Sequence, residues 1–360
     1  MSRLREALGL GLGSGTPGIY NAITDVPGVR VGHATVETTG AHCTGVTAIL
    51  PHGGDLYHDK VTAAATVING YGKTTGLAQI QELGTIETPI LLTNTLSVGA
   101  VWDACVSWML DRFDHEEAPI RSINPVVAEC NDGRLAEIRD RPVAADHVLR
   151  ALDAATGGSV EEGCVGAGAG MVAFGWKSGV GTASRVVTIR GTTYTLGALA
   201  LPNYGSPEQL TVGGVPIGRQ LRPPTEASSG AGSIVVVLAT NLPCSHRQLG
   251  RLCRRVPVGI ARTGGTCDGT SGEFAMAFTT VNRVPQIEQG LLTEERINDA
   301  SGQLDAIFLA VAEATEEAIL SALLSATSTT GRAGCEARAL PIYEVAARLR
   351  DGRDPPECSI

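Results

Sequence analysis

The segment 234–240 is nearly all aliphatic, and it follows directly after a run of serine, glycine and alanine at 228–233. The aliphatic residues predict a buried strand, because β-branched side chains suit a pleated backbone and no charge interrupts them. Gly230 and Gly232 lack a Cβ, so the backbone can bend sharply just before Ser233. The chain is therefore predicted to contain a rigid strand with a hydroxyl residue at its entrance.

At this position, Ser233 could cleave the chain at the peptide bond that precedes it. Its hydroxyl could attack the carbonyl of Gly232, and cleavage there would make Ser233 a new N-terminus. That residue would carry both a nucleophile and an α-amine able to act as its base. A Gly-Ser pair before a strand is also typical of an ordinary turn, so this local pattern leaves both interpretations open.

Composition limits the class of protein. The 360 residues are 43% hydrophobic but only 4% aromatic, which indicates a large, mainly aliphatic core. The net charge of −9 disfavours nucleic-acid binding, which requires a cationic surface. No apolar run reaches the roughly 18–20 residues of a membrane helix, and the N-terminus lacks a secretory apolar region. Nine cysteines without a C-x-x-C pair indicate reduced thiols, so we expect a cytoplasmic protein with neither a nucleic-acid nor a membrane partner.

Hydrophobic patterning predicts an α+β chain without an internal repeat or a composition break between domains. Strands are expected at 44–50, 61–68, 89–92, 123–128, 171–176, 184–189, 193–201, 234–240 and 274–280. Helices are expected at 75–83, from 97 through 109, at 144–155, from 245 through 253, at 297–325 and at 342–349. The proline-containing stretch 203–230 is expected to be a surface loop leading to Ser233. We expect helices packed against mixed sheets.

Ser271 and Glu273 form a second candidate group, immediately before a predicted strand. With one glycine between them, they can present both side chains on the same side of an extended backbone. Glu273 could then orient Ser271, and Ser271 could hydrogen-bond the hydroxyl or amine of Ser233. The alternative is that 269–272 is simply a turn.

Two other polar residues at predicted strand ends could contact a substrate. The side-chain amide of Asn203 is a suitable neutral donor for an oxyanion, although Asn and Gly are also common in turns. Glu129 could hold a substrate ammonium group, or it could be a solvated loop carboxylate.

Cofactor and metal patterns are not found in the sequence. The glycine-rich stretch 166–170 does not fit the dinucleotide pattern G-x-G-x-x-G. The seven histidines include no H-E-x-x-H motif and no i, i+4 pair suited to zinc. We therefore predict neither a cofactor nor a metal.

Several short blocks occur along the chain in a fixed order. They are 25–33, 93–95 with 97–99, 170–171 through 181–185, 203–205, 232–233 with its aliphatic strand, 262–264, 271–273 and 329–332. In this order the blocks resemble the L-aminopeptidase/D-amidase-esterase family, which includes the β-peptidyl aminopeptidases. The resemblance covers nearly the whole chain.

The resemblance implies a four-layer α-β-β-α sandwich, like that of N-terminal-nucleophile hydrolases but with altered strand connectivity. It implies a single self-processing domain, 1–360, that is cut between Gly232 and Ser233 into chains 1–232 and 233–360. No cofactor or metal is implied, and the cleaved units are expected to form a homo-oligomer, a tetramer.

The resemblance also implies roles for individual residues. Ser233 would attack the substrate carbonyl, and its α-amine, with a pKa near 8, could accept the hydroxyl proton. Ser271 and Glu273 match the family's supporting serine and acid. Asn203 matches its oxyanion-stabilising asparagine, and Glu129 its ammonium-binding acid.

Two positions depart from the family pattern. Asn131 stands where a tyrosine pointing into the active site is common, and Lys73 stands where an acidic residue is common. Loss of the aromatic donor could widen the pocket or change how the oxyanion is held.

These residues predict a self-processing serine aminopeptidase that hydrolyses amide, peptide or ester bonds of small substrates with a free amino end. One alternative is an endo-acting oligoamide hydrolase or an acyltransferase on the same fold. A second alternative is an uncleaved binding protein that has lost its chemistry. The side chains accepted, and the choice between α- and β-peptides and between L and D residues, do not follow from the sequence.

Overall fold

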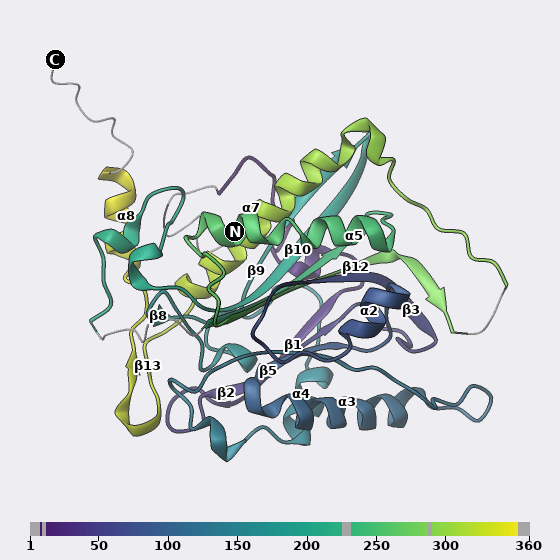
Figure 1. Cartoon of the computed structure of the whole chain (residues 1–360), viewed down its shortest axis with the longest axis horizontal. Coiled ribbons are helices and arrows are strands. Elements are labelled where there is room, and N and C mark those ends of the chain that lie inside the picture. The colour runs from purple at the N-terminus through teal and green to yellow at the C-terminus, as the bar shows by residue number, and fades with distance from the viewer. Residues whose placement is uncertain (1–7, 9–11, 225–231, 287–289, 352–360) are drawn as a thin grey trace.

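The computed structural model describes residues 8, 12–224, 232–286 and 290–351. Two sheets dominate the fold (Figure 1). The six-stranded sheet has, in spatial order, β4 (Thr85–Ile86), β3 (Asp59–Gly70), β12 (Ser271–Pro285), β11 (Gly232–Thr240), β10 (Thr192–Asn203) and β9 (Gly181–Ile189). The four-stranded sheet has β1 (Arg30–Glu37), β2 (Thr44–Leu50), β5 (Ile90–Asn94) and β6 (Val126–Cys130). Two small hairpins pair β7 (Val172–Ala173) with β8 (Trp176–Lys177), and β13 (Thr329–Thr330) with β14 (Glu336–Ala337).

Helices cover the outer faces of both sheets (Figure 1). Those that pack on the four-stranded sheet are α3 (Val98–Phe113) and α4 (Ala145–Asp153). Those on the six-stranded sheet are α5 (His246–Cys253) and α7 (Gln303–Leu324), and α6 (Val256–Arg262) packs on α7. The remaining helices are α2 (Leu77–Leu83), beside β3, and α8 (Ile342–Asp351). The predicted four-layer α-β-β-α sandwich is confirmed.

Strand β11 lies at the centre of this arrangement, with both faces buried. Val235 and Val237 pack between the sheets, whereas Val236 and Leu238 pack under the helices. This two-sided burial explains why the segment is uniformly aliphatic instead of alternating between polar and apolar residues. The segment 44–50, predicted as a strand, is β2, and all seven of its residues are buried as well.

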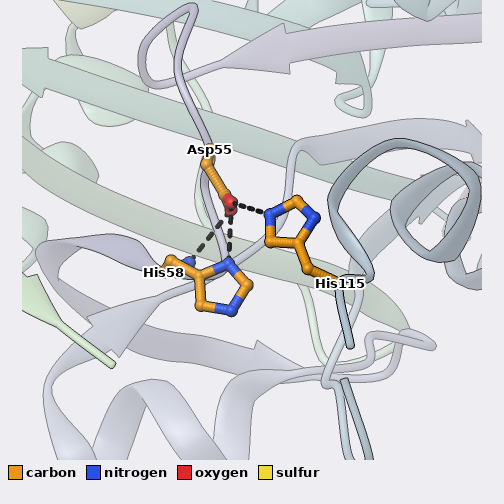
Figure 2. Close-up of side chains that lie close together, drawn as sticks. All are labelled: Asp55, His58 and His115. Atoms are coloured by element: carbon orange, nitrogen blue, oxygen red, sulfur yellow. Dashed lines mark hydrogen bonds and ion pairs between the residues drawn. The ribbon is translucent and has the colours of Figure 1, made fainter. Parts of the chain in front are cut away.

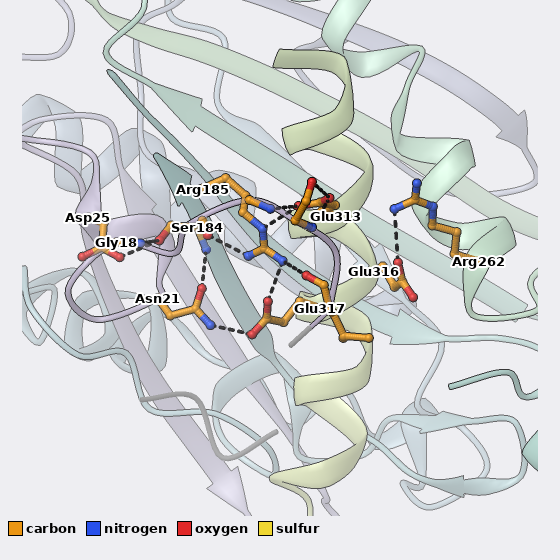
Figure 3. A network of polar contacts seen from close by, with 12 residues as sticks. Gly18, Asn21, Asp25, Ser184, Arg185, Arg262, Glu313, Glu316 and Glu317 are labelled. Atoms are coloured by element: carbon orange, nitrogen blue, oxygen red, sulfur yellow. Dashed lines mark hydrogen bonds and ion pairs between the residues drawn. The ribbon is translucent and has the colours of Figure 1, made fainter. Parts of the chain in front are cut away.

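A buried ionic cluster joins strand β9, helix α7 and the N-terminal segment (Figure 3). The fully buried Arg185 donates from Nε to Glu313 Oε2 at 3.1 Å and from Nη2 to Glu317 Oε2 at 2.7 Å. It also donates to the carbonyl oxygens of Ser184 and Leu12. Asn21 closes the cluster by donating to Glu317 Oε1 at 2.7 Å. Because Glu313 and Glu317 lie on α7 and Arg185 lies on β9, these ion pairs hold the helix in one position on the sheet.

Some predicted element boundaries are wrong. Ser271 and Glu273 lie inside β12 and not before it, because the strand extends from Ser271 to Pro285. Helix α7 begins at Gln303, after Gly302 with a φ of 69°, and not at 297. Helix α6 was not predicted, because Pro257 lies in its first turn, where proline is tolerated. Among the described residues, no helix is both long and apolar enough to cross a membrane.

Candidate functional site

The predicted polar residues gather at a cavity of about 430 Å³. Its lining includes Ser233, Asn203, Glu129 and Asn131, which come from three strands and the turn after β6. A larger cavity of about 980 Å³, lined by the start of α5 and by residues 281–284 and 292–295, contains none of the predicted site residues. Polar groups able to do chemistry therefore converge on the smaller cavity.

Two N–H groups point at the hydroxyl of Ser233. The backbone N–H of Asn131 lies 3.4 Å from Ser233 Oγ, and Asn203 Nδ2 lies 3.5 Å from it. The antiparallel register of β10 and β11 places Asn203 directly opposite Ser233. Ser233 is 3% exposed and lines the cavity floor, so an oxygen close to Oγ would meet both donors in a place poor in water.

The side chain of Asn203 is held in one orientation. Its Oδ1 accepts the backbone N–H of Val172 at 3.0 Å, and its Nδ2 donates to the carbonyl of Asn131 at 2.9 Å. Because the acceptor side is occupied by an N–H donor, the amide must direct Nδ2 toward Ser233.

Lys177 supports this orientation, and the sequence reasoning missed it. Its fully buried Nζ donates to the carbonyl oxygens of Gly168 and Met171 at 3.1 Å and of Ser178 at 2.5 Å. Burial lowers the pKa of Lys177. The three contacts fold the glycine-rich segment around the hairpin that carries Val172. A lone lysine between Trp176 and Ser178, with glycines at 175 and 179, was the only available signal.

Glu129 is 3% exposed and lies on the cavity wall. Its Oε1 accepts the backbone N–H of Lys73 at 2.9 Å, and its Oε2 accepts the hydroxyl of Thr95. Each carboxylate oxygen keeps a second lone pair that can face the cavity. Glu129 is therefore a buried carboxylate oriented for a cationic group, and not a solvated loop residue.

Ser271 lies beside Gly232 and Glu273 beside Ile234, and neither hydrogen-bonds the Ser233 hydroxyl among the described contacts. The parallel register pairs Gly232 with Ser271, and Ser271 Oγ lies 3.1 Å from the position a Cβ on Gly232 would take. Neither Ser271 Oγ nor Glu273 Oε2 has a partner of ordinary hydrogen-bond geometry within the described residues. Burial raises the pKa of Glu273, and the nearby Ser271 hydroxyl and Asn69 amide oppose that rise. The expected hydrogen bond from Ser271 to the Ser233 hydroxyl is absent among the described contacts.

Asn131 contributes through its backbone more than through its side chain. The side chain is exposed, and its Oδ1 accepts the N–H of Gly133 at 3.0 Å. The backbone N–H and C=O are the groups that contact Ser233 and Asn203. Asn131, where the resemblance implies a tyrosine, therefore keeps the backbone donor in place.

The cavity lining also carries three cationic side chains. Lys73, Arg134 and Arg332 line it, and Glu129 is the acidic residue among the described lining. Arg332 also donates to the carbonyl of Gly133 at 3.0 Å, and Lys73 Nζ lies over the ring of Tyr71. The cavity therefore offers Glu129 to a cationic group and the three cationic side chains to an anionic one.

A buried serine at a strand entrance, under two N–H donors and beside an oriented carboxylate, defines a hydrolase with a serine nucleophile as its class. Comparisons with known proteins agree with this class. The family model of peptidase family S58 matches residues 21–337. The β-peptidyl aminopeptidase BapA of Sphingosinicella xenopeptidilytica is 39% identical over 95% of this chain and 89% of its own length.

Solved structures are similar over almost the full chain. A β-aminopeptidase from a Burkholderia species is 40% identical with a TM-score of 0.90, covering 99% of this chain and 100% of that one. The L-aminopeptidase D-Ala-esterase/amidase of Ochrobactrum anthropi is 38% identical with a TM-score of 0.91, covering 98% and 99%. That structure is described as a prototype for the serine aminopeptidases and a variant of the N-terminal-nucleophile hydrolase fold. The chain belongs to peptidase family S58, and the predicted serine aminopeptidase class is confirmed.

Proposed function

We propose that Ser233 is the nucleophile and that the chain first cuts itself between Gly232 and Ser233. The convergence of two N–H groups on Ser233 Oγ, from Asn131 and Asn203, carries this proposal. A methyl group on residue 232 would meet Tyr204 at 3.0 Å and Ser271 Oγ at 3.1 Å, so glycine lets the backbone pack closely here.

The self-cleavage begins when Ser233 Oγ bonds to the carbonyl carbon of Gly232. The C–N bond breaks, the hydroxyl proton passes to the nitrogen, and an ester replaces the peptide bond. Water then hydrolyses the ester, which gives the Gly232 carboxylate and a free α-amine on Ser233. We assign Ser271 and Glu273 a positioning role, because they lie beside Gly232 and Ile234, on either side of Ser233, and would hold that new amine.

In the cleaved enzyme the α-amine accepts the hydroxyl proton as Oγ attacks the substrate carbonyl. The N–H groups of Asn131 and Asn203 stabilise the oxyanion that forms. The protonated amine returns its proton to the leaving amine, and an acyl-enzyme remains. Water hydrolyses this ester in a second cycle of the same proton transfers.

The substrate is proposed to be a short peptide or amide with a free amino end. Glu129 would bind the ammonium group, because its carboxylate is buried and oriented by Lys73 N–H and Thr95. The relatives are named for β-peptidyl aminopeptidase and for L-aminopeptidase and D-Ala-esterase/amidase activities. We propose that this chain likewise removes the N-terminal residue of its substrates, and that β-amino residues are among those it accepts.

We further propose that Lys73, Arg134 and Arg332 favour substrates with a carboxylate beyond the scissile bond. All three line the cavity that holds Ser233. A dipeptide or tripeptide has such a carboxylate at its C-terminus, whereas a simple amide does not.

A substitution of Glu129 tests the amino-terminal specificity. Glu129→Gln can still accept the Lys73 N–H, but it removes the charge that attracts an ammonium group. We expect kcat/KM for free-amine substrates to fall about 10- to 100-fold, since a charge-assisted hydrogen bond contributes about 1.5–3 kcal/mol. The N-acetylated forms of the same substrates serve as the control and should change less than about threefold by the same argument. Equal losses for both series would contradict ammonium recognition.

We also propose that the cleaved units form a tetramer in the cytoplasm. Light scattering of the purified protein should then give four times the 37.2 kDa mass of one chain. A single-unit mass would contradict the assembly and leave the nucleophile assignment intact.

A further inference from the structure

Asp55, His58 and His115 come together outside the cavity that holds Ser233 (Figure 2). His58 Nδ1 lies 2.7 Å from Asp55 Oδ2, and His115 Nε2 lies 3.7 Å from the same oxygen. The three possible ligand atoms all lie within 4.8 Å of one another. Two segments far apart in sequence, the loop before β3 and the segment after α3, thus direct metal-binding atoms at one point.

The hydrogen bonds that Asp55 and His58 make to the backbone determine which of their atoms could bind a metal. Asp55 Oδ1 accepts the backbone N–H groups of Tyr57 and His58, both at 3.0 Å, which leaves Oδ2 for another partner. His58 Nε2 lies 3.0 Å from the carbonyl oxygen of Ala118. A carbonyl can only accept, so Nε2 carries the proton and Nδ1 of a neutral imidazole presents its lone pair to Asp55. Metal-binding histidines are commonly oriented in this way by their second nitrogen.

Two lone pairs 2.7 Å apart repel unless a cation or a proton lies between them. A proton would satisfy the His58–Asp55 pair alone. His115, however, directs its own Nε2 at the same oxygen, and its ring stacks on His58 with centroids 5.3 Å apart and planes 15° apart. A protonated His58 with a neutral His115 that donates from Nε2 to Asp55 Oδ2 is the metal-free arrangement with which zinc would compete. One metal ion satisfies all three groups together.

We propose that Asp55, His58 and His115 bind a zinc ion, with water as the fourth ligand. Two imidazole nitrogens and one carboxylate oxygen suit tetrahedral zinc. Ligand atoms about 2.0–2.1 Å from the metal stand roughly 3.3 Å apart around a tetrahedron, which lies between the 2.7 and 3.7 Å observed. The side chain of His115 is 54% exposed and that of Asp55 is 27% exposed, so the fourth position faces solvent.

The zinc would act on stability and not on the reaction. None of its three ligands lines the cavity of Ser233. The ion would tie the loop that links β2 to β3 to the segment that follows α3, and so fix the outer helix layer to both sheets. A histidine-spacing motif does not reveal this group, because His115 lies far along the chain from Asp55 and His58.

Calorimetric titration of the metal-stripped full chain with ZnCl₂ tests the site. We expect one zinc per chain, a rise of a few degrees in melting temperature, and at least a tenfold weaker affinity for His115→Ala and Asp55→Asn. His147→Ala is the matched control, because His147 pairs with Asp146 at 3.2 Å without forming part of a three-ligand group among the described residues. That variant should bind zinc like the wild type.

A second titration, with Co²⁺, separates this site from the cysteines. An N/O site lacks the thiolate charge-transfer absorption that a cysteine-bound Co²⁺ would show. No zinc binding by the wild type, identical binding by His115→Ala, or a thiolate band would each overturn the proposal. In the first of these cases, the Asp55–His58 contact is an ordinary ion pair.

Discussion

In the cluster around Arg185, all three guanidinium nitrogens donate hydrogen bonds, to two carboxylates and two carbonyl oxygens. Around Ser233, by contrast, Ser271 Oγ and Glu273 Oε2 are buried without a partner of ordinary geometry in the described part of the chain. The two donors to Ser233 Oγ are also long, at 3.4 and 3.5 Å. Both regions bury polar groups, the first between β9 and α7 and the second where β6, β10, β11 and β12 meet.

The difference separates groups that hold the fold from groups that remain available to a reaction. A fully satisfied buried network fixes its members, and breaking it leaves charges stranded in the core. A buried network in which some polar groups lack partners destabilises the resting protein. A substrate or an oxyanion that supplies the missing partner is bound more tightly for that reason. The predictions below test this division.

The largest effect is expected at Arg185. Arg185→Met would leave Glu313 and Glu317 without their cation, so the free energy of unfolding should fall by about 3–5 kcal/mol. Urea unfolding in a Ser233→Ala background, where we expect one uncut chain, measures this loss. Arg185→Lys keeps a positive charge and should lose less. A loss of activity by Arg185→Met without loss of stability would place Arg185 in the reaction instead.

Asn203→Ala should act on rate far more than on stability. Removal of one oxyanion donor typically lowers kcat by about 10²–10³. Asn241→Ala is the matched control, because Asn241 Oδ1 likewise accepts a backbone N–H, from Thr195 at 2.7 Å, outside the cavity. Steady-state kinetics and thermal melting of both variants should show similar melting temperatures and a defect in kcat for Asn203→Ala alone. A matching defect in Asn241→Ala would remove the distinction.

Asp132 provides a pH-dependent test, since it is buried next to Asn131 and neither carboxyl oxygen has a hydrogen bond of ordinary geometry within the described residues. Burial raises its pKa from 3.8 to about 7, so the native state keeps a proton that the unfolded chain releases. Its contribution to stability is therefore greatest below pH 4 and is lost as the pH rises to about 7. Relative to Asp132→Asn, the wild type should lose about 2–3 kcal/mol between pH 5 and pH 8.

Unfolding of the two proteins in parallel at several pH values measures this difference. Parallel stability curves for Asp132→Asn and the wild type would show that Asp132 ionises normally in the folded protein.

The smallest effect is expected at the cationic side chains of the cavity. Lys73→Met should raise KM for peptides with a free C-terminal carboxylate about two- to fivefold, as exposed charge pairs contribute at most about 1 kcal/mol. The C-terminal amides of the same peptides should be unaffected. If both series change alike, Lys73 does not select a carboxylate.

The sequence predicted most elements of the fold because their hydrophobic patterns are local. The aliphatic run 234–240 indicated β11, and the apolar spacing after Ser97 indicated α3. Sheet order could not be predicted, since the pairing of β11 with β10 and β12 joins segments that lie far apart along the chain.

Residues of the candidate site were predicted from the resemblance, but their contacts were not. Glu129 and Asn203 lie in the cavity as expected. Ser271 lies against Gly232 instead of the Ser233 hydroxyl because the parallel register offsets it by one residue. The donor from Asn131 is a backbone N–H, which no inspection of side-chain identity can reveal.

The central claim is that Ser233 becomes an N-terminus, and mass spectrometry of the purified protein under denaturing conditions tests it most directly. The account predicts two chains, 1–232 and 233–360, whose masses together exceed the 37.2 kDa of the precursor by one water molecule. Ser233→Ala should give one intact, inactive chain. A wild-type protein that stays intact after long incubation would contradict the claim and favour a binding protein on the same fold.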